Sequence, residues 1–171
     1  MINENIIRFI KICEEFGLKE NIKNLDKDFK LRLKFQKLFY FSFKLGFPIK
    51  LKYKFYRYGL YSFDLAEIYY ESVEISKKDF RQYINKIQFT KDEKEKIEVL
   101  KEISDAWSDD IEKLEYYSSV LYIYDDMYFK DWSKEKVKNK VLELKPDLFN
   151  KFNSDDVLDQ LKGFGLIQKH G

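Results

Sequence analysis

The stretch from Leu31 to Leu45 constrains the fold more than any other part of the sequence. Its apolar residues recur at helical spacing and then extend around most of the helix circumference. They are Leu31, Phe35, Leu38, Phe39, Tyr40, Phe41, Phe43 and Leu45. A helix that is apolar on nearly every side has to be buried by several neighbours. The pattern leaves one narrow stripe near water, formed by Lys34, Lys37 and Lys44.

The segment after this helix changes its period from helical to two. Gly46 and Pro48 are typical of a helix end, because glycine adopts the left-handed cap and proline cannot continue the helix. Between Ile49 and Tyr58, apolar residues alternate with Lys50, Lys52 and Lys54. This alternation predicts a half-buried strand with a charged outer face. We expect a tight turn at Gly59 and then another helix, for which Ser62 is the N-cap.

The rest of the chain favours further helices, and 171 residues are enough for one domain with a substantial core. Helix starts are predicted at Asn3, Thr90, Ser108, Ser133 and Ser154, and short strands at 73–75 and 164–167. Pro146 is expected to end one helix, and Asp125-Asp126 to break another. The predicted fold class is therefore α+β, predominantly α-helical with a small β component, in a single domain spanning 1–171.

Two motifs around the central helix carry a resemblance to a known family. Gln36-Lys37-Leu38-Phe39-Tyr40 is followed by the extended run and then by Tyr58-Gly59-Leu60-Tyr61-Ser62. This resembles the YwgA-like proteins and, more remotely, the Panacea/SocA antitoxin domains. Their pattern is a QKLxY helix, a strand and a YGPYS-type turn, in which Leu60 here replaces proline.

The resemblance implies a winged-helix-like domain in a family described as predicted transcriptional regulators. It marks one set of residues as a structural motif. These are Gln36, Leu38, Tyr40, Tyr58, Gly59, Tyr61 and Ser62.

Charge is distributed unevenly, although the formal net charge is only +2. Ten cations and one acid lie between Lys27 and Arg57, whereas twelve acids and five cations lie between Lys91 and Asp126. A basic segment of this kind can contact a phosphate backbone. The candidate nucleic-acid-binding residues are Lys34, Lys37, Lys50, Lys52, Lys54 and Arg57.

Three interpretations of this charge pattern stay open. The chain can be a DNA-binding transcriptional regulator that contacts double-stranded DNA mainly through phosphates. Alternatively, its opposite charges can pair with a protein partner or a second copy, giving an antitoxin-like or adaptor module. In the third interpretation the lysines only keep a strand edge soluble and unpaired.

Sequence features typical of catalysis and of membrane insertion are scarce. The one histidine, His170, is next to last, and there is no Cys/His cluster, glycine-rich phosphate loop or nucleophile elbow. We therefore expect no enzyme, no cofactor and no metal site, and interpret Asp109-Asp110 and Asp125-Asp126 as helix-end charges. The single Cys13 and the lack of a long apolar run favour a cytoplasmic protein without a membrane span.

Overall fold

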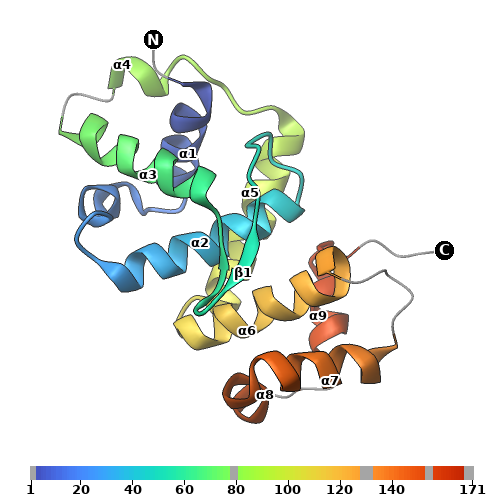
Figure 1. The fold of residues 1–171 in the computed structure, drawn as a ribbon. Coiled ribbons are helices and arrows are strands. Elements are labelled where there is room, and N and C mark those ends of the chain that lie inside the picture. Colours follow the sequence, from blue (N-terminus) through green and yellow to red (C-terminus); the bar gives the residue numbers. More distant parts are fainter. Residues whose placement is uncertain (1–2, 78–80, 128–132, 153–155, 168–171) are drawn as a thin grey trace.

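The computed structural model describes residues 3–77, 81–127, 133–152 and 156–167. Within these ranges the chain is mainly helical, with one antiparallel sheet of two short strands (Figure 1). The predicted α+β class with a small β component is confirmed. Buried hydrophobic residues form one cluster that extends from Ile6 to Ile167.

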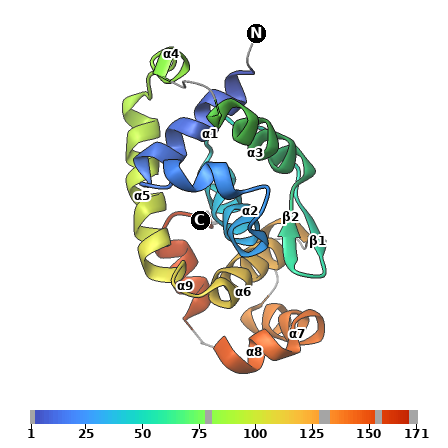
Figure 2. The same ribbon diagram turned by 90° about the vertical axis from the view of Figure 1, so that its left-hand side faces the viewer.

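The central helix, α2 (Phe29–Lys44), lies in the middle of the molecule (Figure 2). It begins where the Asp28 side chain accepts a hydrogen bond from the Leu31 N–H, at 3.0 Å. Every residue from Phe35 to Ser42 is buried, which confirms the prediction of a helix covered on several sides. Its neighbours include α1 (Glu4–Glu15), α5 (Lys91–Trp107), α6 (Ile111–Leu121) and the strand β2 (Gly59–Tyr61).

The two strands are shorter than the sequence predicts. β1 (Lys54–Tyr56) pairs with β2 (Gly59–Tyr61), and Lys54 lies opposite Tyr61. Residues 49–53 lie outside the sheet, although their side chains alternate in exposure as those of an extended chain do. The N–H of Ile49 bonds to the Phe47 carbonyl, and that of Lys52 bonds to the Asp64 carboxylate. The predicted alternation of buried and exposed side chains nevertheless holds from Ile49 to Tyr56. The second strand was not predicted.

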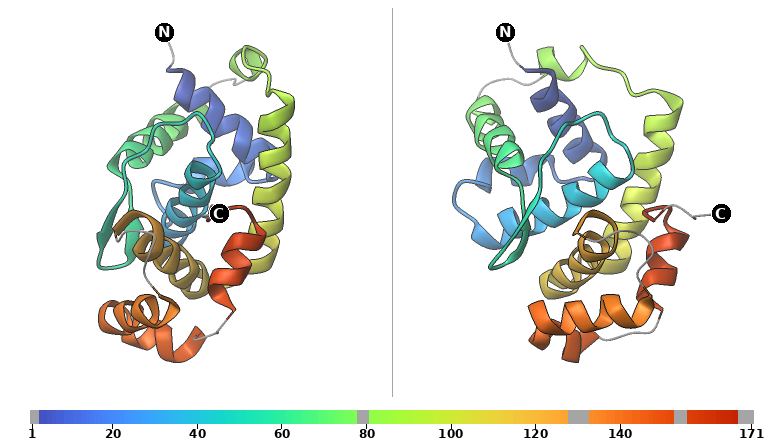
Figure 3. Two further views of the ribbon diagram at one scale, coloured as in Figure 1. Left: turned by 90° about the vertical axis from the view of Figure 1, so that its right-hand side faces the viewer. Right: turned by 45° about the vertical axis from the view of Figure 1, so that its right-hand side comes forward.

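The remaining elements surround α2 and then extend below it. Three elements contact α1, namely η1 (Lys19–Asn24), α3 (Phe63–Ser76) and α4 (Arg81–Ile84). After α6 come the π-helical turn η2 (Tyr122–Met127), α7 (Lys134–Leu144), α8 (Pro146–Phe152) and α9 (Val157–Gly163). Helices α7, α8 and α9 pack against α6 at the lower end of the molecule (Figure 3).

Several predicted helix N-caps are present in the structure. The hydroxyls of Ser62, Thr90 and Ser133 each accept a backbone N–H bond three residues later, as expected. The predicted Ser154 cap lies outside the described residues.

Several predicted ends and strands are wrong. The 73–75 strand lies inside α3, and 164–167 forms no strand. Asp125 lies within η2, so that pair does not break the helical path. By contrast, the prediction that Pro146 ends a helix is confirmed, because α7 ends at Leu144. Pro146 also begins α8, since the first helical turn tolerates a residue without an N–H.

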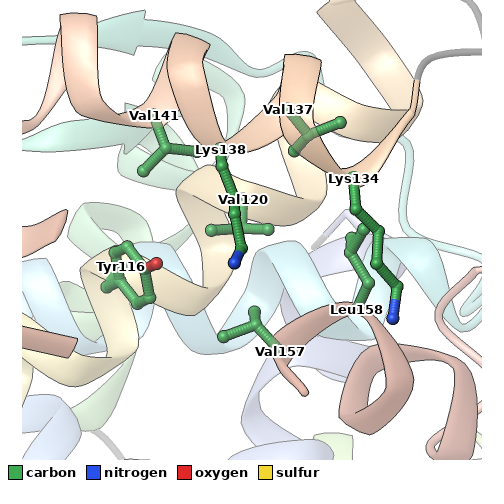
Figure 4. A pocket seen from close by; sticks show the side chains of 8 residues that line it. All are labelled: Tyr116, Val120, Lys134, Val137, Lys138, Val141, Val157 and Leu158. Carbon is green, nitrogen blue, oxygen red and sulfur yellow. The ribbon is translucent and has the colours of Figure 1, made fainter. Parts of the chain in front are cut away.

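A small cavity lies where α6, α7 and α9 meet (Figure 4). Its lining consists mainly of apolar side chains, including Tyr116, Val120, Val137 and Val141. Its volume of about 20 Å³ is room for roughly one water molecule, whereas small-molecule sites usually measure about 300–1,000 Å³. We therefore regard it as a packing gap.

Phe39 provides a test of the central position of α2. Its side chain is 2% exposed, and its ring centroid lies 4.8 Å from that of Phe9. Phe39→Ala is expected to lower the free energy of unfolding by about 3–5 kcal/mol in urea titrations, since it leaves a cavity in the core. Leu142→Ala, at a 41% exposed position, is the control and should change it by less than about 1 kcal/mol. Equal losses in the two variants would contradict this packing.

Candidate nucleic-acid interface

A buried side-chain amide attaches the β-hairpin to α2. Gln36 Nε2 donates to the Ser62 carbonyl at 3.0 Å, and the Ser62 N–H donates to Gln36 Oε1 at 2.8 Å. The amide thereby satisfies both backbone polar groups of Ser62, as a neighbouring strand would. The Ser62 hydroxyl in turn accepts the Leu65 N–H at 3.2 Å and caps α3. One side chain of α2 therefore fixes both the end of the hairpin and the start of the next helix.

Lys37 forms a second buried attachment and cannot contact a phosphate. Its ammonium donates to the Leu60 carbonyl at 2.9 Å, and the residue is 1% exposed. Burial lowers the pKa of Lys37 to about 8; the Glu115 carboxylate opposes this shift and the Lys145 ammonium adds to it. The prediction that Lys37 faces water and binds nucleic acid is wrong, because β2 lies over this part of α2. Lys44, predicted on the same stripe, is half-buried and pairs with Asp125.

The tip of the hairpin is held by residues from α6 and from the end of α7. Lys145 donates to the Glu115 carboxylate at 2.8 Å and to the Arg57 carbonyl at 2.9 Å. Its ammonium also lies 5.4 Å from the centroid of the Phe55 ring. Gly59 has a φ of +86°, and a Cβ added there would meet Glu115 Cγ at 2.9 Å. This turn therefore requires glycine for both its backbone conformation and its close contact with α6.

The outer side of the hairpin carries aromatic rings beside lysines. The rings of Tyr56, Tyr61 and Phe63 contact one another edge to face, with centroids 5.2–6.0 Å apart. Phe63 is 63% exposed and Tyr56 is 41% exposed. With Asp64 these rings and two lysines line an open depression. We call this surface the hairpin face; it comprises Lys52, Lys54, Tyr56, Tyr61 and Phe63.

The lysines on this side of the extended segment have no structural partners. Lys50, Lys52 and Lys54 are exposed, and within the described residues none of their ammonium groups forms a hydrogen bond or ion pair. The nearby Asp64 carboxylate accepts the backbone N–H of Lys52 at 2.9 Å instead. These cations are therefore available to an external anion.

The other predicted site residues lie apart from this row. Arg57 is exposed at the hairpin tip, with its guanidinium 5.6 Å from the Tyr58 ring centroid. Tyr58 packs edge to face against Phe29 at 5.4 Å. Lys34 is half-buried on α2 and has no ion pair among the described side chains. The structure thus groups Lys50, Lys52 and Lys54 along one segment and removes Lys37 from the site.

The motif residues have structural positions around the same hairpin. Leu38 and Tyr40 are buried in the core, and Tyr40 contacts the ring of Tyr53 at 5.0 Å. Tyr61 lies on the hairpin face, where its hydroxyl is 3.4 Å from that of Tyr69. Sequence reasoning missed Tyr56 and Phe63 as site residues. Tyr56 could have been found, because it continues the alternation on the lysine side.

The acidic pairs have structural roles where they are described. The Asp110 carboxylate caps α6 by accepting the Glu112 N–H at 2.9 Å, and Asp125 pairs with Lys44. In the part of the chain that the structure covers, no His, Cys, Asp and Glu side chains are grouped to hold a metal ion. Each helix in those ranges is too short or too polar to cross a bilayer.

Comparisons of the chain with protein-family models, curated proteins and solved structures gave no match. The resemblance to the YwgA-like family therefore rests on the two motifs alone, and the function has to be argued from the site.

Gly59 and Gly17 form a matched pair for testing the hairpin turn. Both have positive φ, at +86° and +70°, but a Cβ at Gly17 would meet no atom within 4 Å. Gly17→Ala should cost about 1–2 kcal/mol of unfolding free energy from the backbone alone. Gly59→Ala should cost about 1–3 kcal/mol more, because Glu115 is held by Lys145 and has to shift. Equal costs in thermal unfolding would show that α6 does not restrict this turn.

Lys37 gives the stability a specific pH dependence. Its pKa is about 8 in the folded chain and 10.5 in the ordinary side chain. The unfolded chain therefore binds more protons between these values, so stability rises with pH. Relative to Lys37→Met, the wild-type free energy of unfolding should rise by about 2 kcal/mol between about pH 7 and 9.5. If the free energies of unfolding of wild type and Lys37→Met change with pH in the same way in denaturant titrations, the burial of the Lys37 ammonium is contradicted.

Proposed function

We propose that this chain binds nucleic acid through phosphate contacts made by Lys50, Lys52 and Lys54. The observation that carries the proposal is a row of exposed ammonium groups, on one side of an extended segment, that have no partners among the described residues. The resemblance to the YwgA-like family implies a DNA-binding regulator of transcription with a winged-helix-like fold. This analogy supports a role in transcription, and the exposed lysines support the phosphate contact.

The spacing and attachment of the segment suit a phosphate backbone. Alternate residues of an extended chain are about 6.6 Å apart, so the three lysines extend over about 13 Å. The Lys52–Asp64 bond fixes the middle of the segment, and the Gln36–Ser62 pair fixes its return strand. Because this backbone is already held in place, less chain entropy is lost when the lysines bind. Such contacts provide affinity without reading the base sequence.

A protein-interaction module is the second candidate, and one observation favours it. Phe29, at 48% exposed, and Tyr58, at 47% exposed, form an aromatic pair with Arg57 beside it. Tyrosine and arginine are enriched at the energetic centres of protein interfaces. An antitoxin-like or adaptor role, or a homodimer, would use this tip of the hairpin. In that case, changing the three lysines would leave binding to the partner largely intact.

Changing Lys50, Lys52 and Lys54 to Gln tests the proposed contact. Each phosphate contact on duplex DNA contributes about 0.9 to the slope of log affinity against log salt. The triple variant should therefore flatten the slope by about 2.7 in titrations between about 50 and 200 mM salt. Affinity should fall similarly for every duplex sequence.

A second triple variant controls for the loss of charge. Lys86, Lys91 and Lys94 are also exposed, and changing them to Gln removes the same charge outside the row. This control should keep the wild-type slope. If both triple variants change the salt slope equally, the effect comes only from net charge. If the variant at Lys50, Lys52 and Lys54 keeps the wild-type salt slope, these lysines are excluded as the interface.

A further inference from the structure

We infer that the nucleic acid bound at the hairpin face is single-stranded and that its bases stack on Tyr56 and Phe63. This inference rests on the proposed function and names its substrate class. Six large hydrophobic side chains are at least 41% exposed among the described residues. Four of them lie on the hairpin or against it, namely Tyr56, Phe63, Tyr58 and Phe29.

The rings of the hairpin face are ordered before any ligand binds. Tyr56 meets Tyr61 at an interplanar angle of 84° and Phe63 at 86°, and Tyr61 meets Phe63 at 73°. The Tyr61 hydroxyl is in turn 3.4 Å from that of Tyr69 on α3. Because each of the three rings contacts the other two, little side-chain freedom is lost when a base stacks on the exposed part of Tyr56 or Phe63. The high exposure of Tyr56 and Phe63 leaves part of each ring open to solvent.

Charge complementarity identifies the occupant of this aromatic depression. Lys52 and Lys54 line the same depression as the rings, so an anionic group and an aromatic group can be bound side by side. A nucleotide carries both groups on one sugar, with the base on C1′ and the phosphates on the 5′ and 3′ oxygens. Base stacking on aromatic side chains combined with a cationic track is the usual mode of single-strand binding. Asp64, the one acid in the lining, lies in the first turn of α3, where the helix N-terminus offsets its charge.

A duplex uses only part of this surface. Inside a double helix the base faces are stacked on each other, and only phosphates, sugars and groove edges reach a protein. Tyr56 and Phe63 line the depression together with Lys52 and Lys54. Against a duplex, the Phe63 ring would displace hydration from phosphates without replacing its hydrogen bonds. The rings therefore favour a strand whose bases are already unstacked.

The test compares a labelled oligothymidylate of about 12 nucleotides with a duplex of the same length, by fluorescence anisotropy on the full chain. The variant Tyr56→Ala/Phe63→Leu removes both aromatic faces, and leucine keeps apolar bulk at the more exposed position. Each lost stacking contact should weaken single-strand binding about 5- to 100-fold. Duplex affinity should change less than about twofold, and the salt slope on the single strand should be unchanged.

Two further variants distinguish stacking from general damage. Tyr70→Ala removes a 44% exposed ring on α3 outside the hairpin face and should leave both affinities at the wild-type level. Tyr56→Trp enlarges the stacking surface and should match or exceed wild-type single-strand affinity. Thermal unfolding of every variant establishes that it is folded.

The inference and the proposed function fail in different ways. If the aromatic variant binds the single strand as wild type does, or loses affinity for both ligands equally, base stacking is overturned. The lysine triple variant would still lower both affinities, and the proposed function would stand. If the wild-type chain binds neither ligand above background at low salt, both are overturned.

Discussion

The paired hydrogen bonds between the Gln36 amide and the Ser62 backbone are the interaction on which the arrangement of this chain depends. A hairpin of two three-residue strands is marginal on its own, because it buries little and leaves most of its backbone groups unpaired. Here α2 supplies the missing partners from side chains. The Gln36 side chain hydrogen-bonds the N–H and carbonyl of Ser62, and Lys37 donates to the Leu60 carbonyl. Two consecutive polar residues in an otherwise apolar stretch of helix therefore act as a third strand for the hairpin.

This arrangement divides the hairpin into a structural side and an outer side. On the inner side, Phe55 packs against Tyr122 and Leu60 is fully buried. On the tip, Lys145 and Glu115 hold the turn. Contacts on the inner side and at the tip hold the hairpin backbone. Polar or aromatic side chains on the hairpin face are therefore less needed for stability and can contact a ligand.

The sequence allowed prediction of those elements whose signals are local. The central helix, the Ser62, Thr90 and Ser133 caps and the alternation from Ile49 to Tyr56 all depend on residues close in the chain. The burial of Lys37 could not be predicted in this way, because helix periodicity does not show which side of α2 a hairpin over 20 residues later will cover. Likewise Pro146 is both a helix stop and a good first helical residue, and only tertiary packing decides between the two. For the site, the lysine row was predictable, whereas the grouping of Tyr56, Tyr61 and Phe63 required the pairing of two strands.

The basic segment between Lys27 and Arg57 also separates into two kinds of cation. Lys37 and Lys44 are bound internally, to the Leu60 carbonyl and to Asp125, and the Arg32 guanidinium donates to the Leu25 carbonyl at 2.9 Å. A desolvated ammonium is costly to bury, so Lys37 is explained by the carbonyl it satisfies, not by a ligand. A segmental charge count adds these residues to the lysine row and so overstates the charge that an anion would meet. For the proposed nucleic-acid contact, the relevant charge is the smaller set of Lys50, Lys52 and Lys54. The Lys52–Asp64 bond and the strand pairing that begins at Lys54 hold their backbone, and Lys52 and Lys54 line one depression with three aromatic rings.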